Sequence, residues 1–307
     1  MHEKELDLRV SIAGVILKNP ITTASGTFSA KESGSFYDLS ELGAIITKGV
    51  SNEAWEGNKT PRIAETYGGM LNAVGLQNPG VDSFILQELP YLIEAADTKI
   101  IVNVAGKTVE DYCSVVEKLW DAKVDLLEIN ISCPNIKCGG ISFGTNPHLA
   151  AEITKEVKKK ARQPIIIKLT PNVTDITEIA KAVEAEGADA VSLINTLMGM
   201  KIDVHSRKPS LWHKTGGLSG PAIKPVAVRM VYQVRRAVGI PIIGLGGIMT
   251  GEDVVEFIMA GADAVSIGTA ALIDPRAPIR IKNELIAYME RYHLKSIKEI
   301  QDGFIDL

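Results

Sequence analysis

Short apolar runs alternate with amphipathic stretches from residue 21 almost to the end of the chain, and this alternation limits the possible folds more than any other feature. Eight apolar runs are predicted to be strands, at residues 21–24, 44–48, 100–104, 126–131, 165–169, 190–194, 241–245 and 264–267. Apolar residues at three-to-four spacing predict helices at residues 81–96, 109–120, 147–161, 175–186, 221–238, 252–260 and 275–291. Such alternation gives right-handed βαβ units, and eight parallel strands close a (β/α)8 TIM barrel. We therefore expect an α/β TIM barrel.

One domain is expected to cover residues 1–307, because no repeat, low-complexity tract or linker divides the chain. Hydrophobic residues make up 46% of it but aromatic residues only 5%. The apolar content therefore comes from Val, Ile, Leu and Ala, which fill parallel strands covered on both faces. Residues 9–17 are predicted to form a short β-hairpin that precedes the barrel and covers its lower end.

Composition also excludes several function classes. The net charge is −4 and the two signs are interspersed, so there is no basic surface for nucleic acid. The first seven residues are too charged for a signal peptide, and no apolar stretch reaches the roughly 20 residues of a spanning helix. The odd number of cysteines indicates reduced thiols. We expect a cytoplasmic protein that binds no membrane.

Polar residues gather where the predicted strands end, and in a TIM barrel these C-terminal ends build the active site. Lys48 and Lys168 end apolar strands, where an unpaired buried ammonium is costly. They indicate an anionic partner, such as a reduced flavin ring or a carboxylate substrate. The alternative is that each lysine extends past the strand end to solvent.

Glycines follow the last two predicted strands, at Gly244–Gly247 and Gly268. In this fold the loops after strands seven and eight usually cradle a phosphate, and glycine lets backbone N–H groups approach it. A glycine-rich segment at 216–220, before another predicted helix, could supply further N–H donors. The alternative is that these glycines only form tight turns.

Asparagines and one cysteine complete the predicted rim. Amides at strand ends suggest recognition of a planar ligand with alternating donors and acceptors, although asparagine is also a common turn residue. The residues are Asn72, Asn78, Asn103, Asn130, Asn135 and Asn195.

Cys133 ends a strand before Pro134, where an ionised thiol could act as base or nucleophile. Cys113 is predicted to pack in a helix and Cys138 to lie in a loop. No metal site is expected, because the cysteines lack paired spacing and the histidines are scattered.

Several longer segments resemble the dihydroorotate dehydrogenases over nearly the whole chain, and the class 1B catalytic subunits most. They lie at residues 19–26, 68–79, 130–135, 194–199, 215–225 and 244–247. The resemblance implies oxidation of (S)-dihydroorotate to orotate in de novo pyrimidine biosynthesis. It implies that Cys133 removes the C5 proton while the hydride from C6 passes to N5 of FMN.

The resemblance also implies a set of binding residues. FMN would contact Ser25, Lys48, Gly49, Asn103, Asn130, Lys168 and Ile194, with its phosphate side at Gly220, Gly246, Gly247, Gly268 and Thr269. The substrate would contact Lys48, Asn72, Ala73, Val74, Gly75, Leu76, Asn130, Asn195 and Thr196, with Asn135 as a weaker candidate.

The segment at 135–145 resembles the class 1B loop, which implies a partner subunit carrying FAD and a [2Fe–2S] cluster, with NAD⁺ as final acceptor. A homodimer within a heterotetramer is then expected. This chain has no ferredoxin-type run of cysteines for such a cluster. The alternatives are a class 1A fumarate-dependent enzyme or another FMN-dependent dihydropyrimidine oxidoreductase, and then a non-redox sugar-phosphate lyase or isomerase barrel.

Overall fold

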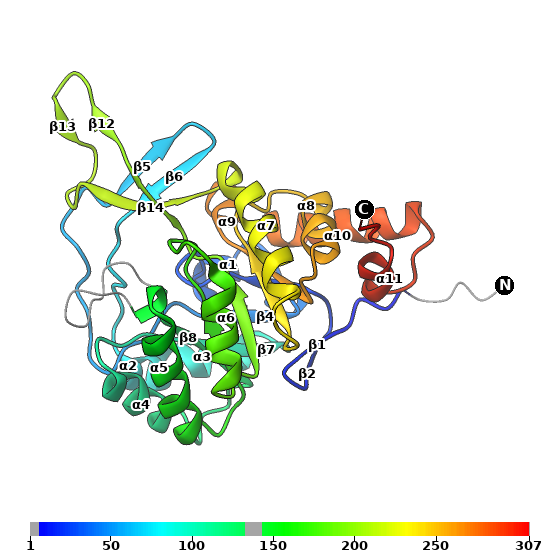
Figure 1. Cartoon of the computed structure of the whole chain (residues 1–307), viewed down its shortest axis with the longest axis horizontal. Coiled ribbons are helices and arrows are strands. Elements are labelled where there is room, and N and C mark those ends of the chain that lie inside the picture. The colour runs from blue at the N-terminus through cyan, green and yellow to red at the C-terminus, as the bar shows by residue number, and fades with distance from the viewer. Residues whose placement is uncertain (1–5, 133–142, 307) are drawn as a thin grey trace.

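Eight parallel strands close into a barrel in the computed structural model, which describes residues 6–132 and 143–306 (Figure 1). The strands are β3 (Ile21–Thr23), β4 (Ala44–Ile46), β7 (Lys99–Val104), β8 (Leu126–Asn130), β9 (Ile165–Lys168), β10 (Ala190–Leu193), β15 (Ile242–Leu245) and β16 (Ala264–Ile267). All neighbours pair in parallel, and β16 pairs with β3 to complete the ring. The predicted TIM barrel is confirmed, and each strand lies in its predicted run except that β7 begins one residue earlier.

Helices surround the barrel, and six of the seven predicted ones form as single main helices. These are α4 (Val109–Lys118), α5 (Pro147–Lys160), α6 (Ile176–Ala185), α7 (Lys224–Arg235), α8 (Gly251–Met259) and α10 (Ala277–Arg291). The stretch predicted as one helix at 81–96 is instead α2 (Val81–Ser83), a π-helical segment (Phe84–Glu88) and α3 (Leu89–Ala95). Pro90 has no N–H to donate to the carbonyl four residues earlier, which disfavours a regular α-helix there. Three short α-helices were not predicted: α1 (Ala30–Ser33), α9 (Thr269–Ile273) and α11 (Ile297–Asp302).

Three aspartates, Asp125, Asp189 and Asp263, fix the lower ends of adjacent strands. Each comes directly before a barrel strand and accepts a hydrogen bond from a backbone N–H near the start of the neighbouring strand, over 2.8–2.9 Å. Each also pairs with a cation, namely Lys99, Lys158 and Arg235 respectively. A one-residue slip would break these contacts and turn every side chain to the wrong face, so the aspartates help to set the register.

The N-terminal hairpin closes the lower end of the barrel, as the sequence predicts. Its strands are β1 (Val10–Ile12) and β2 (Val15–Leu17), paired antiparallel. Ile12 and Leu17 are completely buried. They pack on a layer of inward-facing apolar residues, namely Ala44, Ile46, Ile101, Leu126, Ile166, Ala190, Ile243 and Ala264.

An antiparallel sheet that the sequence does not predict lies over the upper end. Its strands β5 (Ile63–Thr66), β6 (Gly69–Asn72), β11 (Leu197–Met200) and β14 (Thr215–Ser219) pair in the order β11-β14-β6-β5, and we call it the roof sheet. A small hairpin of β12 (Ile202–Asp203) and β13 (Lys208–Pro209) projects beyond it (Figure 1). The glycine-rich segment at 216–220, which the sequence places before a helix as a source of N–H donors, therefore lies mostly in strand β14. Glycine occurs in β14 because a Cβ on Gly217 would lie 1.9 Å from Oγ1 of Thr196.

Candidate active site

A cavity of about 300 Å³ opens at the C-terminal ends of the barrel strands, under the roof sheet. Its volume is at the lower end of the range for small-molecule sites. The predicted site residues that line it are Ser25, Lys48, Gly49, Asn72, Val74, Gly75, Leu76, Asn130, Lys168, Ile194, Asn195, Thr196, Gly220, Gly246, Gly247, Gly268 and Thr269. Segments up to about 240 residues apart in the sequence thus meet at one site, as the barrel geometry requires.

Four other residues that the sequence analysis singled out do not line the cavity. Asn103 is completely buried below the cavity, and Ala73 packs beside Leu71 and Leu211. The side-chain oxygen of Asn78 accepts hydrogen bonds from the backbone and hydroxyl of Ser51 and from the backbone of Gly80, so Asn78 holds a turn. Cys113 is half-buried in α4, and burial raises the pKa of its thiol.

Cys133, Asn135 and Cys138 lie outside the described residues. The chain on both sides of them is well anchored. Ser132 donates from its backbone N–H and its hydroxyl to the side-chain oxygen of Asn130, at 3.3 and 2.7 Å. Phe143 is buried, and its ring meets that of Tyr112 edge-on at 6.3 Å. Ser132 is thus held at the end of β8, and Phe143 is held against α4.

Lys48 and Lys168 are the only charged side chains among the described residues that line the cavity. Lys168 is only 4% exposed, and its ammonium donates to Oγ of Ser25 at 2.9 Å. It does not extend to solvent, which excludes the alternative interpretation for this residue. A cavity with two cations and, among the described residues, no lining carboxylate favours an anionic ligand.

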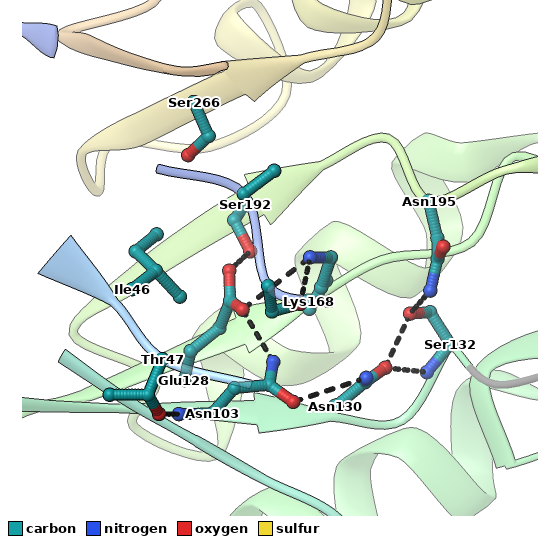
Figure 2. A network of polar contacts seen from close by, with 12 residues as sticks. Ile46, Thr47, Asn103, Glu128, Asn130, Ser132, Lys168, Ser192, Asn195 and Ser266 are labelled. Atoms are coloured by element: carbon teal, nitrogen blue, oxygen red, sulfur yellow. Dashed lines mark hydrogen bonds and ion pairs between the residues drawn. The ribbon is translucent and has the colours of Figure 1, made fainter. Parts of the chain in front are cut away.

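A buried polar network lies directly below the cavity (Figure 2). At its centre, Glu128 of β8 accepts hydrogen bonds from the Asn103 amide at 2.5 Å and the Ser192 hydroxyl at 2.7 Å. Its carboxylate also lies 3.5 Å from the ammonium of Lys168. The strand register places these residues at two heights in the barrel. Asn103 pairs with Glu128, and Asn130 pairs with Lys168 two residues closer to the cavity. Asn103 therefore supports the cavity wall from below.

Amide and hydroxyl groups continue this network along the rim. The Asn130 amide donates to the Asn103 oxygen at 3.3 Å, and the Asn195 amide donates to the Ser132 hydroxyl at 2.6 Å (Figure 2). These bonds, together with that from Ser132 to Asn130, connect the ends of β7, β8 and β10. They hold Asn130 and Asn195 in fixed orientations, which recognition of a planar ligand requires.

Sequence reasoning missed Glu128, Ser132, Ser192 and Asn172. The position of Glu128 could have been predicted from the sequence. It lies two residues before Asn130, and side chains at this spacing share one face of a strand. Asn172 gave no comparable signal. Its amide donates to the carbonyl of Thr196 at 3.0 Å and its oxygen accepts from the N–H of Met198 at 2.8 Å, so it holds the segment that leads into the roof sheet.

The loop after β15 requires glycine. Gly246 and Gly247 have φ angles of 125° and 83°, which side chains rarely adopt. A Cβ on Gly247 would also lie 2.8 Å from the backbone nitrogen of Lys224. Across the cavity, the Thr269 hydroxyl donates to Oγ of Ser219 at 2.9 Å, which connects the start of α9 to the roof sheet.

Asp253 stabilises this loop, and its substitution should destabilise the fold in a pH-dependent way. It completes a capping box with Thr250, accepts from the N–H of Met249 and pairs with Lys224 at 2.7 Å. Burial opposes ionisation of Asp253, but its bonds to Lys224 and the backbone outweigh burial and lower its pKa. Its stabilisation is therefore present above the unfolded pKa of about 3.9 and is lost as pH falls through the lower folded value.

We expect Asp253→Asn to lower the free energy of unfolding by about 1–2 kcal/mol at pH 7. Urea unfolding at several pH values measures the difference, which should shrink below about pH 4 as the wild-type carboxyl is protonated. Asp302→Asn, at the end of α11, is a control that should change stability little. A difference that stays constant down to pH 3 would contradict the assignment.

Comparisons with known proteins agree on one family. A family model described as "Dihydroorotate dehydrogenase" matches residues 7–289. A protein from Alkaliphilus metalliredigens named "Dihydroorotate dehydrogenase B (NAD(+)), catalytic subunit" is 64% identical over 97% of this chain and 98% of its own length. A Bacillus cereus protein of the same name is 54% identical over 96% of both chains.

A solved structure gives the same fold. The crystal structure of DHODH from Eimeria tenella in complex with ferulenol superimposes with a TM-score of 0.80, covering 99% of this chain and 89% of the other, at 22% sequence identity. At this identity the likeness supports the barrel fold alone. Among the described residues, no helix is long and apolar enough to cross a membrane, and no group of three or more His, Cys, Asp or Glu side chains could hold a metal ion.

Proposed function

The chain belongs to the dihydroorotate dehydrogenase family, and from this we propose that it oxidises (S)-dihydroorotate to orotate as the FMN-containing catalytic subunit of an NAD⁺-linked enzyme. The observation that carries the proposal is the cavity itself. Its lining brings together two lysines, two rim asparagines and a group of glycines. Such a site suits a ligand with a phosphate, a planar ring and an anionic substrate beside it.

The donor set fits FMN. Gly220, Gly246, Gly247, Gly268 and Thr269 would hold the phosphate, because all five line the cavity and Gly220 lies close to both Gly247 and Thr269. Ser25, Lys48, Gly49, Asn130, Lys168 and Ile194 would surround the ring, and Asn103 would support them from below. When bound, FMN supplies a two-electron acceptor that takes a hydride.

The chain's own residues would bind and orient the substrate. Lys48, Asn130, Asn195, Thr196 and the turn from Asn72 to Leu76 would hold the carboxylate and the amide edge of dihydroorotate. Ala73 would contribute through its backbone only, since its side chain packs in an apolar cluster. The roof sheet would exclude water from one side of the site.

Cys133 would take the C5 proton as a thiolate. The support is the resemblance together with the position of Cys133 directly after Ser132, which is bonded to both rim asparagines. General base catalysis typically accelerates such a step by about 10²–10⁴-fold. Lys48 and the amides would stabilise negative charge that develops on the substrate carbonyls.

A partner subunit would accept the electrons. The names of the relatives include NAD⁺ and the words "catalytic subunit", which favours a second subunit. We propose that this partner carries FAD and a [2Fe–2S] cluster, that the chain forms one FMN-binding domain and a homodimer within a heterotetramer, and that the complex is cytoplasmic.

Reconstitution with FMN tests the proposal. The purified chain should bind FMN with a flavin absorption spectrum, and anaerobic dihydroorotate should bleach that spectrum and release orotate. A protein that stays colourless in excess FMN would refute both redox interpretations and leave the sugar-phosphate barrel. Bleaching by another dihydropyrimidine, but not by dihydroorotate, would refute the substrate.

The electron acceptor separates the two subclasses. We expect turnover with NAD⁺ only when the electron-transfer partner is present, and little turnover with fumarate. Rapid turnover of fumarate by the chain alone would show a class 1A enzyme.

A further inference from the structure

Glu128 is a carboxylate buried at the centre of the barrel, and none of the proposed roles uses it. It is 0% exposed and does not line the cavity, so it cannot touch a ligand there. Burial of a charge is costly unless it is paired and hydrogen-bonded. Glu128 meets this condition through Ser192 on one oxygen and through Asn103 and Lys168 on the other.

The contact with Lys168 has an electrostatic consequence. Lys168 presents its ammonium to the cavity beside Ser25, and Glu128 lies directly behind it. Lys48 is the other charge that lines the cavity, and no carboxylate lines it among the described residues. At short range in a low-dielectric interior, the charge of Glu128 offsets much of the positive potential that Lys168 projects into the cavity.

We infer that Glu128 is a positioning residue that holds Lys168 in place and partly cancels its charge, and so sets how strongly the site prefers reduced over oxidised FMN. The inference rests on the proposed function. Two-electron reduction with uptake of one proton leaves a negative charge on the flavin ring. Without the charge of Glu128, Lys48 and Lys168 would give the wall two net positive charges and stabilise that state more strongly. The neutral Glu128–Lys168 pair leaves one and so limits the stabilisation.

Glu128→Gln tests this, because it keeps the size and hydrogen-bonding capacity of the side chain and removes only its charge. We expect the ratio of affinities for reduced and oxidised FMN to rise about tenfold, which raises the two-electron reduction potential by about 30 mV. The potential is measured by anaerobic equilibration of the FMN-loaded protein with a redox dye. A ratio within twofold of the wild-type value, or a lower ratio, would overturn the inference.

Two further variants separate charge from structure. Ser192→Ala removes a hydrogen bond to the same carboxylate but keeps both charges, so the ratio should stay within twofold of wild type. Lys168→Gln should lower the ratio, and Glu128→Gln in that background should restore it to within threefold of wild type. A double variant that stays as low as Lys168→Gln alone would refute the inference even if the single Glu128 variant does not fold.

Failure of the inference can be distinguished from failure of the proposed function. If the wild-type chain binds no FMN, the proposed function is wrong. If every variant binds FMN and the potential does not depend on Glu128, only the present inference is wrong.

Discussion

Replacement of Cys133 by serine should slow reduction of bound FMN by dihydroorotate about 10²–10⁴-fold while FMN stays bound. A serine hydroxyl is far harder to ionise than a thiol, so it is a much weaker base at neutral pH. Stopped-flow absorbance of the FMN-loaded protein under anaerobic conditions measures the rate. The wild-type rate should also rise with pH as the thiol ionises.

Cys113→Ser is the matched control, because Cys113 is half-buried in α4 and does not line the cavity. It should reduce FMN at close to the wild-type rate. Reduction of the Cys133→Ser variant at the wild-type rate would refute the base assignment. A flat rate profile from pH 6 to about 9 would also count against a thiol base.

Gly217→Ala should impair dihydroorotate binding severely, because the added Cβ would lie 1.9 Å from Oγ1 and 2.6 Å from Cβ of Thr196. Both atoms belong to Thr196, which lines the cavity, so either Thr196 or strand β14 must move. Overpacking of this kind typically costs about 1–3 kcal/mol. Displacement of Thr196 should also raise KM for dihydroorotate about 10- to 100-fold, which corresponds to a loss of about 1.4–2.7 kcal/mol of binding free energy. Affinity for FMN should change less, since Gly217 faces Thr196.

Gly239→Ala is the control, since the atom nearest to its added Cβ is 3.6 Å away, on a glutamate side chain. It should leave KM unchanged. The double variant Gly217→Ala/Thr196→Gly removes the colliding side chain but also a predicted substrate contact, so it should recover stability without recovering KM. An unchanged KM in Gly217→Ala would show that the roof sheet does not position Thr196.

The barrel could be predicted from sequence because its signals are local. Each strand is an apolar run, and each main helix has its own three-to-four spacing, so the eight strands and most helices follow from short windows. The roof sheet could not be predicted in this way. Its strands come from two separate connections, β5 and β6 between β4 and β7, and β11 and β14 between β10 and β15. The glycines of β14 look like a loop signal in the sequence, although Gly217 is required by the close approach of Thr196.

The candidate site was predictable to a similar degree. Lys168 and Asn130 were correctly placed at strand ends, and both line the cavity. The sequence did not distinguish the level of Asn103 from that of Asn130, because that depends on the register between β7 and β8. Glu128 was missed because an acid inside an apolar run acquires meaning only when its partners on β7, β9 and β10 are known.

The barrel interior is apolar at its lower end and contains a buried ion pair nearer the cavity, so these two layers should diverge differently among related sequences. The lower layer, sealed by Ile12 and Leu17, is held by apolar contact alone, so volume-conserving exchanges among aliphatic residues should accumulate there. Glu128 and Lys168 hold opposite charges in one buried pair, and loss of either partner alone is strongly destabilising. Across diverging lineages these two positions should therefore change together or not at all, while the layer below them drifts freely.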